Sequence, residues 1–442
     1  QIGTGTSILT SADNRIGATT IGDGTLQVDG GLETQTIAMT GTSELDGNGI
    51  VQAAGGVPTT ITGDDGASSI AVNGDGILRA DGDLGGGSDL VVLSGTLDTG
   101  TGTLSLGGGD DTLVLNDGAV IGGAGIDAGD GTDLLQVNNA DALSLDGASV
   151  GGFESLEKLN TGILTLTGDH AYTDGTTISA GTLQIGDGGT SGSLASDVLN
   201  NATLAFNRSD TYTFDGLISG SGGVGQVGTG TTIMTGDNTY AGETVVQSGT
   251  LVIEGDQSGA TGLTSVESGA VLGGTGIIGG SVIVADGGAI SPGAAEGQAG
   301  TLTINGDLEL GQTAQLNVNF GQADVIGGPL NDHIDVKGDL VLDGTLNVTE
   351  TDGGTFGPGI YRVISYEGDL TNKDLELTSS DYVLQTSVAN QVNLVNTAGQ
   401  NLNFWDGSAG PQNDGTVDGG DGTWSLADDA FWTTDTGELN AP

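Results

Sequence analysis

Seven times along this chain a glycine is followed by Thr-Leu, and a short run of alternating apolar residues begins there each time. These glycines are Gly24, Gly95, Gly102, Gly181, Gly249, Gly300 and Gly344. A variant, Gly-Asp-Leu, begins at Gly82, Gly306, Gly338 and Gly368. A turn glycine followed by a few β-formers is one small repeated unit. Such a unit cannot bury its apolar face alone, so the pattern predicts coils stacked on one another in a solenoid.

Composition agrees with an ordered all-β chain. With 87 Gly, no Cys and 4% aromatic residues in 442, the chain has little material for a globular core of large side chains. A net charge of −51 is typical of disordered chains, which repel themselves and do not collapse. Here, however, 35% of the residues are hydrophobic, and Val, Ile and Leu alternate with polar residues between turns. We therefore expect folded β-structure with little or no α-helix.

Strands of three to six residues between frequent turns suit either a β-sandwich or a solenoid. Sandwich domains close at about 100 residues, and no Pro/Ser-rich linker interrupts the turn pattern over the first ~350 residues. Connections between parallel strands are nearly always right-handed. The sequence thus predicts a right-handed parallel β-helix with coils of roughly 20–23 residues. Leu183, Leu251 and Leu302 should point inward, whereas Gln184 and Val252 should point outward.

The clearest internal repeat is longer than one coil. Residues 162–185 align without a gap with residues 230–253 at an offset of 68. A third, weaker copy runs from Ile8 to Val28. In each of the two good copies a Thr-Gly-Asp turn precedes a tyrosine, Tyr172 or Tyr240, which we expect to cap the coil or pack over its edge. These features favour a structural role for the repeat.

This repeat resembles the passenger-associated transport repeat of autotransporters, the type V secretion proteins of Gram-negative bacteria. The family pattern, Thr-Gly-x-Asn-Thr-Tyr followed by Gly-Thr-Leu-x-Ile, is met almost fully by residues 235–253 and closely by 167–185. The first copy departs from it at Ser11 and Arg15, which replace the glycine and the tyrosine. The resemblance implies export, passage through a C-terminal β-barrel missing here, and display of a β-helical passenger on the outer surface of the cell, where it stays attached or is released.

Composition shifts divide the chain into four parts. Residues 1–160 form Asp/Gly-rich coils, 161–260 carry the two good repeats, 261–400 are regular coils with loop insertions, and 401–442 hold all three Trp. The last part is expected to be a cap or the start of a further passenger unit. Pro292 and Pro329 mark wider loops, which on solenoids often carry binding. Without a signal-like start or barrel-like end, the chain is expected to be a passenger fragment.

Two stretches, residues 122–127 and 128–135, resemble the calcium-binding nonapeptide of RTX proteins, with Asp127, Asp130 and Asp133 as the candidate ligands. Residues 106–113 are a shortened relative of the same motif. The match is imperfect, because Gly129 stands where an aliphatic residue is expected and the copies are few and unevenly spaced. Asp-rich solvated turns are the favoured interpretation, and calcium binding at 107–133 stays open. No metal or cofactor residue is assigned.

The sequence contains no arrangement of residues that indicates catalysis. The few cations are scattered, and none stands beside an Asp cluster at coil spacing: Arg15, Arg79, Lys158, Arg208, Lys337, Arg362 and Lys373. The two histidines, His170 and His333, are far apart and are expected in turns. The Gly-Asp-Ser-Gly and Gly-Asp-Ser-Leu motifs of protease and esterase autotransporters are both missing. We therefore assign no catalytic residue and expect a protein that is not an enzyme.

The net charge limits the classes of molecule that the chain can bind. A chain at −51 repels nucleic acid and anionic membranes. Together with the resemblance, this predicts adhesion to a host surface or extracellular-matrix component, or self-association with the same protein on neighbouring cells. One alternative is a passive stalk that presents another module. Another is a calcium-binding, RTX-like secreted protein.

Overall fold

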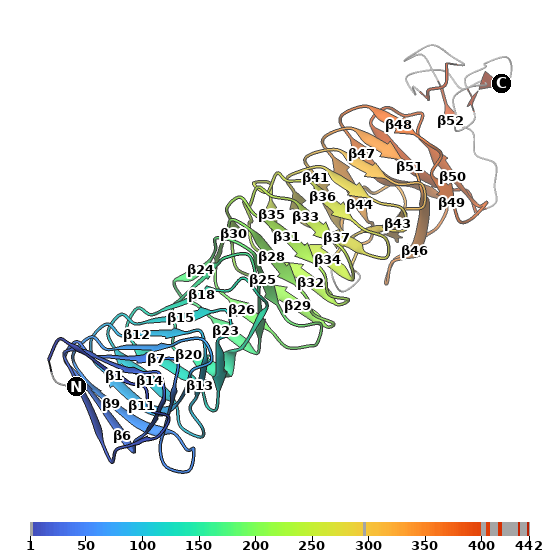
Figure 1. Ribbon diagram of the computed structural model, residues 1–442. Coiled ribbons are helices and arrows are strands. Elements are labelled where there is room, and N and C mark those ends of the chain that lie inside the picture. The colour runs from blue at the N-terminus through green and yellow to red at the C-terminus, as the bar shows by residue number, and fades with distance from the viewer. Residues whose placement is uncertain are drawn as a thin grey trace. The chain divides into compact units, whose positions relative to one another are not determined.

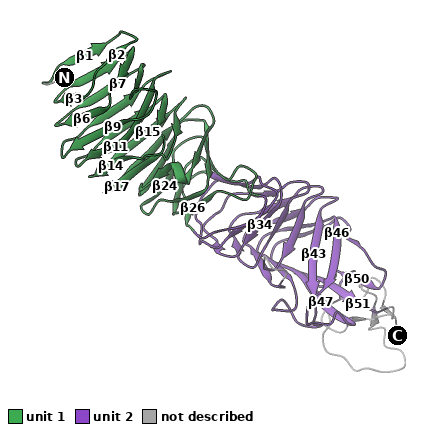
Figure 2. Cartoon of the chain, turned by 90° about the horizontal axis from the view of Figure 1, so that it is seen from below, with its two compact units in different colours: residues 1–208, 216–222 green, residues 209–215, 223–442 purple. Residues whose placement is uncertain are grey.

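The computed structural model describes residues 3–294, 298–398, 404–406, 414–417, 432–433 and 440–441. The chain forms two compact units, unit 1 with residues 1–208 and 216–222 and unit 2 with residues 209–215 and 223–442 (Figure 2). In each unit, strands pair in parallel with the strands one coil away (Figure 1). The predicted parallel β-solenoid is confirmed. The one helix in the described residues is a single 3-10 turn, η1 (Gly147–Ser149).

Unit 1 is built from two large sheets and two smaller groups of strands. The first large sheet has the order β1 (Thr6–Leu9), β4 (Thr25–Val28), β7 (Glu44–Gly47), β10 (Ser69–Val72), β12 (Leu90–Leu93), β15 (Thr112–Asn116), β18 (Leu134–Asn138), β21 (Ser155–Leu159), β24 (Gly175–Ile178), β27 (Val198–Asn200), β30 (Ile218–Ser219). The second comprises β2 (Asn14–Arg15), β5 (Gly31–Glu33), β8 (Ile50–Gln52), β11 (Ile77–Gly85), β14 (Leu104–Gly108), β17 (Ile126–Asp130), β20 (Val150–Gly151), with β3 (Thr19–Gly22), β6 (Thr36–Thr40), β9 (Thr59–Asp64), β13 (Thr96–Asp98) and β16 (Val120–Gly122) joined at its side. The smaller groups are β19 (Leu143–Asp146), β22 (Ile163–Thr167), β25 (Thr182–Ile185), β28 (Thr203–Phe206), and the pair β23 (Asp169–Ala171), β26 (Ser193–Ala195).

Unit 2 continues the same architecture with three main groups of strands. The first is β31 (Gly223–Gln226), β33 (Thr244–Val246), β36 (Thr264–Val266), β39 (Val282–Val284), β42 (Leu308–Leu310), β45 (Leu340–Leu342), β48 (Leu370–Asn372). The second is β29 (Thr211–Phe214), β32 (Thr231–Met234), β34 (Thr250–Ile253), β37 (Val271–Gly274), β40 (Ala289–Pro292), β43 (Gln315–Phe320), β46 (Thr345–Glu350), β49 (Glu376–Leu377). The third is β35 (Asp256–Gln257), β38 (Ile277–Ile278), β41 (Thr301–Ile304), β44 (His333–Val336), β47 (Gly359–Tyr366), β51 (Gln391–Asn396), β50 (Tyr382–Gln385). A small antiparallel sheet joins β52 (Phe404–Trp405), β53 (Trp432–Thr433), β54 (Asn440–Ala441).

Coil length follows from the strand register. Leu90 of β12 pairs with Thr112 of β15, and Thr112 pairs with Leu134 of β18, so one coil there takes 22 residues. In unit 2 the coils widen, since Leu308 of β42 pairs with Leu340 of β45, 32 residues later. The predicted coil length therefore holds for unit 1 at these strands, while unit 2 carries insertions between its later strands.

The core explains the Gly-Thr-Leu repeat. A strand begins at the threonine or leucine of all seven copies, and each of those leucines is at most 5% exposed. Because side chains alternate along a strand, this leucine fixes which residues face inward. The predicted inward positions Leu183, Leu251 and Leu302 are fully buried. The outward prediction was wrong for Val252, which is only 3% exposed and lies in register between Ile233 and Gly273 in its sheet.

The last strands of unit 2 pair differently. β47 pairs in parallel with β44, but β51 lies antiparallel to both β47 and β50. Pairing between β47 and β51 shifts register between Arg362 and Ile364. Parallel pairing continues in the other two groups to β48 and β49, whereas in this group it ends at β47, where β51 and β50 add two antiparallel strands.

The four-part division drawn from composition stays a prediction. Its last part, residues 401–442, falls largely outside the described residues. No helix in the ranges given above is long and apolar enough to cross a membrane.

Candidate functional site

The transport repeats place their tyrosines inside the coil. Tyr172 and Tyr240 are 4% and 2% exposed, so the expectation that they pack over the coil edge was wrong. The Tyr240 hydroxyl lies 2.6 Å from Oγ1 of the buried Thr244. Tyr172 Oη lies 3.1 Å from His170 Nδ1, and His170 Nε2 lies 2.9 Å from the Thr167 carbonyl oxygen. In both good copies of the repeat, a buried tyrosine hydroxyl therefore lies within hydrogen-bond distance of a side chain of the same copy.

We expect Tyr240→Phe to lower the free energy of unfolding of unit 2 by about 1–2 kcal/mol, because it leaves the buried Thr244 hydroxyl without this partner. Urea unfolding followed by circular dichroism measures the change. The double variant Tyr240→Phe/Thr244→Val should recover part of the loss, since both polar partners are then gone. A single variant as stable as the native chain would contradict this role.

Both histidines lie in strands rather than in the predicted turns. His170 is in β23 and His333 is in β44, and each is at least 94% buried. Burial lowers the pKa of His170, and it lowers the pKa of His333 to about 4. Both rings are therefore neutral at physiological pH, and they serve as hydrogen-bonding groups of the coil interior.

A line of carboxylates runs through the interior of unit 1. Asp89, Asp111 and Asp133 each stand just before a strand of the first large sheet, and each is at most 2% exposed. Their Oδ1 atoms accept backbone N–H groups from the preceding coil: from Ser68 at 2.6 Å, from Asp89 at 2.7 Å and from Asp111 at 2.7 Å. We call these three residues the carboxylate ladder.

The ladder is desolvated as well as hydrogen-bonded. In the described residues, no group bonds to the second carboxylate oxygen of Asp89, Asp111 or Asp133, although each of these oxygens is buried. Burial raises the pKa of Asp89 to about 7, against the opposing effect of the Ser68 N–H. Burial likewise raises the pKa of Asp111 and of Asp133. A spacing of 22 residues between aspartates that each precede an apolar strand was the sequence signal for this ladder, and our sequence analysis missed it.

The candidate calcium ligands are not brought together. Asp127 and Asp130 are exposed positions of β17, whereas Asp133 is buried in the carboxylate ladder. Across the described ranges, no three acidic or histidine side chains are grouped as ligands of a metal ion. The RTX-like glycines have another use, because Gly107 of β14 pairs in register with Gly129 of β17 and the two backbones meet closely.

Millimolar calcium should therefore raise the melting temperature of this protein no more than magnesium does, since both act by screening the −51 net charge. Thermal melts with matched chloride salts measure the effect. Saturable calorimetric binding of micromolar calcium that is lost in Asp130→Asn, an exposed substitution, would show instead that these turns are a calcium site.

Two lysines, Lys158 and Lys337, make contacts within the fold. Lys158 is fully buried, and its Nζ donates to the carbonyl oxygens of Leu159, Asn160 and Ala180. Burial lowers the pKa of Lys158 to about 8. Lys337 Nζ forms ion pairs of 2.9 Å with both Asp335 and Glu367. This use of lysines suits a scaffold that folds by stacking.

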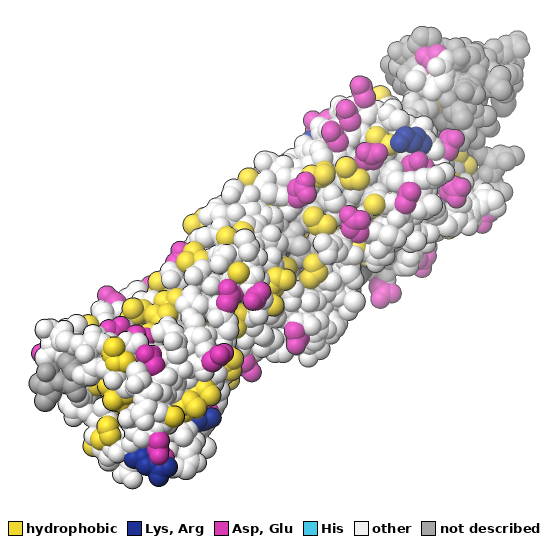
Figure 3. Space-filling view, in the orientation of Figure 1, with side chains coloured by type: hydrophobic (Ala, Val, Ile, Leu, Met, Phe, Trp, Pro, Cys, Tyr) yellow, Lys and Arg dark blue, Asp and Glu magenta, His cyan; other side chains and the backbone are white. Residues whose placement is uncertain are grey.

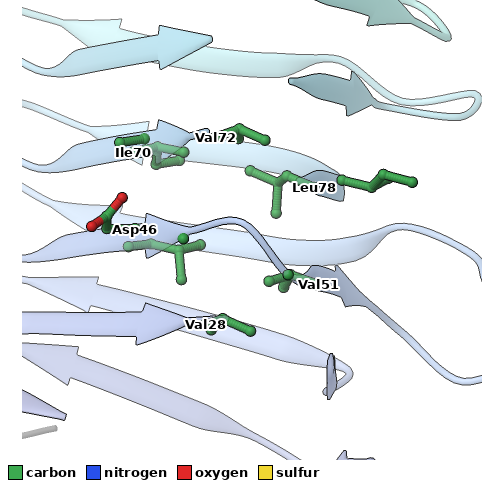
Figure 4. A pocket seen from close by; sticks show the side chains of 11 residues that line it. Val28, Asp46, Val51, Ile70, Val72 and Leu78 are labelled. Atoms are coloured by element: carbon green, nitrogen blue, oxygen red, sulfur yellow. The ribbon is translucent and has the colours of Figure 1, made fainter. Parts of the chain in front are cut away.

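One small internal cavity lies in the core of unit 1. Val28, Val51, Ile70, Val72 and Leu78 line a cavity of about 10 Å³ (Figure 4). A cavity of that size holds one water molecule at most. This internal cavity therefore holds no organic ligand, and the larger pockets are open ones, three of about 420–500 Å³ lined by unit 1 residues and one of about 410 Å³ lined by unit 2 residues.

The predicted loops lie in the insertions of unit 2. Pro292 is the last residue of strand β40, so the loop that this proline marks begins after it, at Gly293. Residues 321–332, called loop 321–332 below, connect β43 to β44 and contain Pro329. Two buried side chains hold it: Asn331 accepts N–H groups of residues 321 and 322, and Asp332 accepts the Gly300 N–H at 2.9 Å. This insertion is thus a fixed part of the fold.

Comparison with known proteins agrees with this architecture. A family model described as the passenger-associated-transport-repeat matches residues 1–28, 156–185 and 226–253. The chain is also 50% identical over 250 residues to a protein named adhesin BmaC autotransporter, from Brucella suis biovar 1 (strain 1330). That match covers 54% of this chain and 7% of the length of the relative. The resemblance to autotransporter passengers with transport repeats is confirmed.

Proposed function

We propose that this chain is a surface-exposed passenger segment of an autotransporter that acts in adhesion or bacterial self-association. The observation that carries the proposal is the 50% identity over 250 residues to an autotransporter adhesin, in a chain that folds as a stacked β-solenoid with three transport repeats. The proposed place of action is the extracellular side of the outer membrane. A C-terminal β-barrel elsewhere in the full-length protein would anchor it there.

Outside its few cationic positions, the surface favours contact with cationic or neutral partners. The chain carries 58 acidic and 7 basic residues, and acidic side chains are scattered over the visible face (Figure 3). Such a surface repels nucleic acid and anionic membrane, and it attracts basic patches. A host surface component, an extracellular-matrix component or another copy of the chain is the proposed partner. No catalytic role is proposed.

The test is display of the chain, fused to a heterologous barrel, on a non-adherent bacterium. Adhesion predicts binding of the cells to host cells or matrix-coated surfaces, and self-association predicts settling of the cells with one another. Cells that display the barrel alone, or an unrelated solenoid of equal length, are the controls. If the displayed chain changes neither binding nor settling, the adhesive function fails and the passive stalk stands.

Mixing labelled and unlabelled cells separates the two modes. Self-association recruits only cells that display the chain, whereas adhesion needs no second copy. Part-buried asparagines on neighbouring strands of one sheet already form hydrogen bonds with one another, as Asn347 Nδ2 donates to Asn317 Oδ1 at 2.9 Å. Their amides are therefore partly occupied, and this favours the insertions of unit 2 over the flat faces as the contact region.

A further inference from the structure

We propose that unit 2 contains a binding pocket for an acidic saccharide, a sugar that carries a carboxylate. The inference deepens the proposed adhesive function and rests on it, because it names the chemistry that a surface adhesin would recognise. The pocket has a volume of about 410 Å³ and lies where loop 321–332, β47, β51 and β52 meet. Volumes of a few hundred Å³ are typical of small-molecule sites.

Arg362 supplies the charge. Its Nε donates to Asn393 Oδ1 at 2.6 Å, and its Nη1 donates to Ser365 Oγ at 3.2 Å. Within the described residues, Arg362 has no ion pair with a carboxylate, whereas Arg15, Arg79 and Lys337 each have one. In a chain with 58 acidic residues, a half-buried guanidinium held only by neutral groups is left to bind an external anion.

An amide network orients the pocket floor. Asn393 Nδ2 donates to Gln385 Oε1 at 3.1 Å and to Gln391 Oε1 at 3.2 Å, while Asn393 Oδ1 accepts from Arg362. These contacts use the amide oxygens and leave N–H groups of Arg362 and Gln391 as donors. A surface rich in donors around a guanidinium binds a carboxylate through charge-assisted hydrogen bonds.

The backbone at the pocket departs from regular geometry at two points. The pairing of β47 with β51 shifts register between Arg362 and Ile364, and such interruptions of a strand pair redirect side chains next to binding sites. Asp324 has φ +61°, a left-handed conformation that costs energy in a residue other than glycine. It is held there because its N–H donates to the Ile360 carbonyl oxygen at 2.9 Å. Asn331 Nδ2 also fixes the Val325 carbonyl oxygen at 2.8 Å.

Apolar side chains complete the walls. Ile326 and Ile360 are 57% and 40% exposed, and both line the pocket together with Trp405. Aromatic and aliphatic side chains pack against the C–H face of a sugar ring. The Asp324 carboxylate can accept hydrogen bonds from the hydroxyl groups of the sugar. One guanidinium and one nearby carboxylate match a saccharide that presents one carboxylate at a time, flanked by neutral sugar rings with several hydroxyls. A more highly charged sulfated or phosphorylated ligand would be repelled by Asp324.

The experiment is calorimetry of the purified chain with a tetrasaccharide of alternating glucuronic acid and N-acetylglucosamine. The matched ligand is the same tetrasaccharide with its carboxyl groups reduced to alcohols. We expect saturable binding of the acidic form that weakens as salt is raised, and binding about tenfold or more weaker for the reduced form. Arg362→Ala should weaken binding of the acidic form by a similar factor and abolish the preference between the two ligands.

Two further variants are controls, one at a pocket wall and one at a cation outside the pocket. Ile326→Ser replaces an exposed wall residue and should weaken binding of both ligands equally. Arg79→Ala removes a cation of unit 1 and should leave binding unchanged. No saturable binding by the native chain, equal binding of the two tetrasaccharides, or an unaltered affinity in Arg362→Ala would each overturn the proposal. If displayed cells adhere although the chain binds no acidic saccharide, only this inference fails. If the chain binds but displayed cells do not adhere, the adhesive function fails.

Discussion

Gly107→Ala should destabilise unit 1 by about 3–5 kcal/mol, which combines left-handed backbone strain with overpacking. Gly107 has φ +113°, and a Cβ built there would lie 1.9 Å from the Gly85 carbonyl oxygen of the preceding coil. Neither the coil backbone nor its neighbour can move away without breaking parallel pairing along the stack. Hydrogen exchange of peptides covering residues 80–135, measured by mass spectrometry, should show the loss of protection locally, because solenoids open in segments.

Gly55→Ala is the matched control. Gly55 also has a positive φ, +83°, but nothing lies within 4 Å of the position that its Cβ would take. Gly55→Ala should therefore lower the free energy of unfolding by only about 1–2 kcal/mol, which is the strain of the left-handed conformation alone. Equal costs at positions 55 and 107 would mean that the close approach between coils contributes nothing, and a calcium role for the glycine-rich turns would regain support.

Unit 1 should become more stable as pH falls from about 7 toward 4. The pKa of Asp89 is about 7 in the folded chain and 3.8 in its ordinary state, so the folded state binds the proton more tightly. That stabilisation is fully present below pH 3.8 and is lost as pH rises through about 7. Its size is on the order of 2–4 kcal/mol, since each pKa unit corresponds to about 1.4 kcal/mol. Burial is the main cause of this shift, and the negative charges of Asp111, Asp83 and Asp64 contribute to it.

Asp89→Asn isolates this effect from the general loss of negative charge in acid. The amide oxygen can still accept the Ser68 N–H, while the buried charge is gone. We expect the variant to be more stable than the native chain at pH 8 and to lose most of the difference by pH 4. Hydrogen exchange over residues 64–116, corrected for intrinsic rates at each pH, measures it. Asp127→Asn, at an exposed position, should leave the pH profile unchanged. A native profile flat between pH 4 and 8 would refute the buried ladder.

Much of the fold could be predicted from the sequence, because stacking repeats one local rule. A glycine turn followed by Thr-Leu fixes where a strand begins and which side chain enters the core, so Leu183, Leu251 and Leu302 were placed correctly. The transport repeat was recognisable for the same reason, since its pattern is contiguous in the sequence. Local periodicity and turn chemistry determined these features without reference to distant residues.

Only the tertiary structure decided features that depend on neighbours from other coils. Val252 is buried although it alternates with the buried Leu251 and Ile253, and the Tyr240 hydroxyl lies against the buried Thr244. The carboxylate ladder arises because residues 22 positions apart come into register, which desolvates groups that look like ordinary acidic turns. The Arg362 pocket likewise needs an antiparallel strand, a register shift and a pinned loop to converge. Such long-range juxtapositions set burial and pKa, because desolvation depends on what surrounds a group rather than on its sequence neighbours.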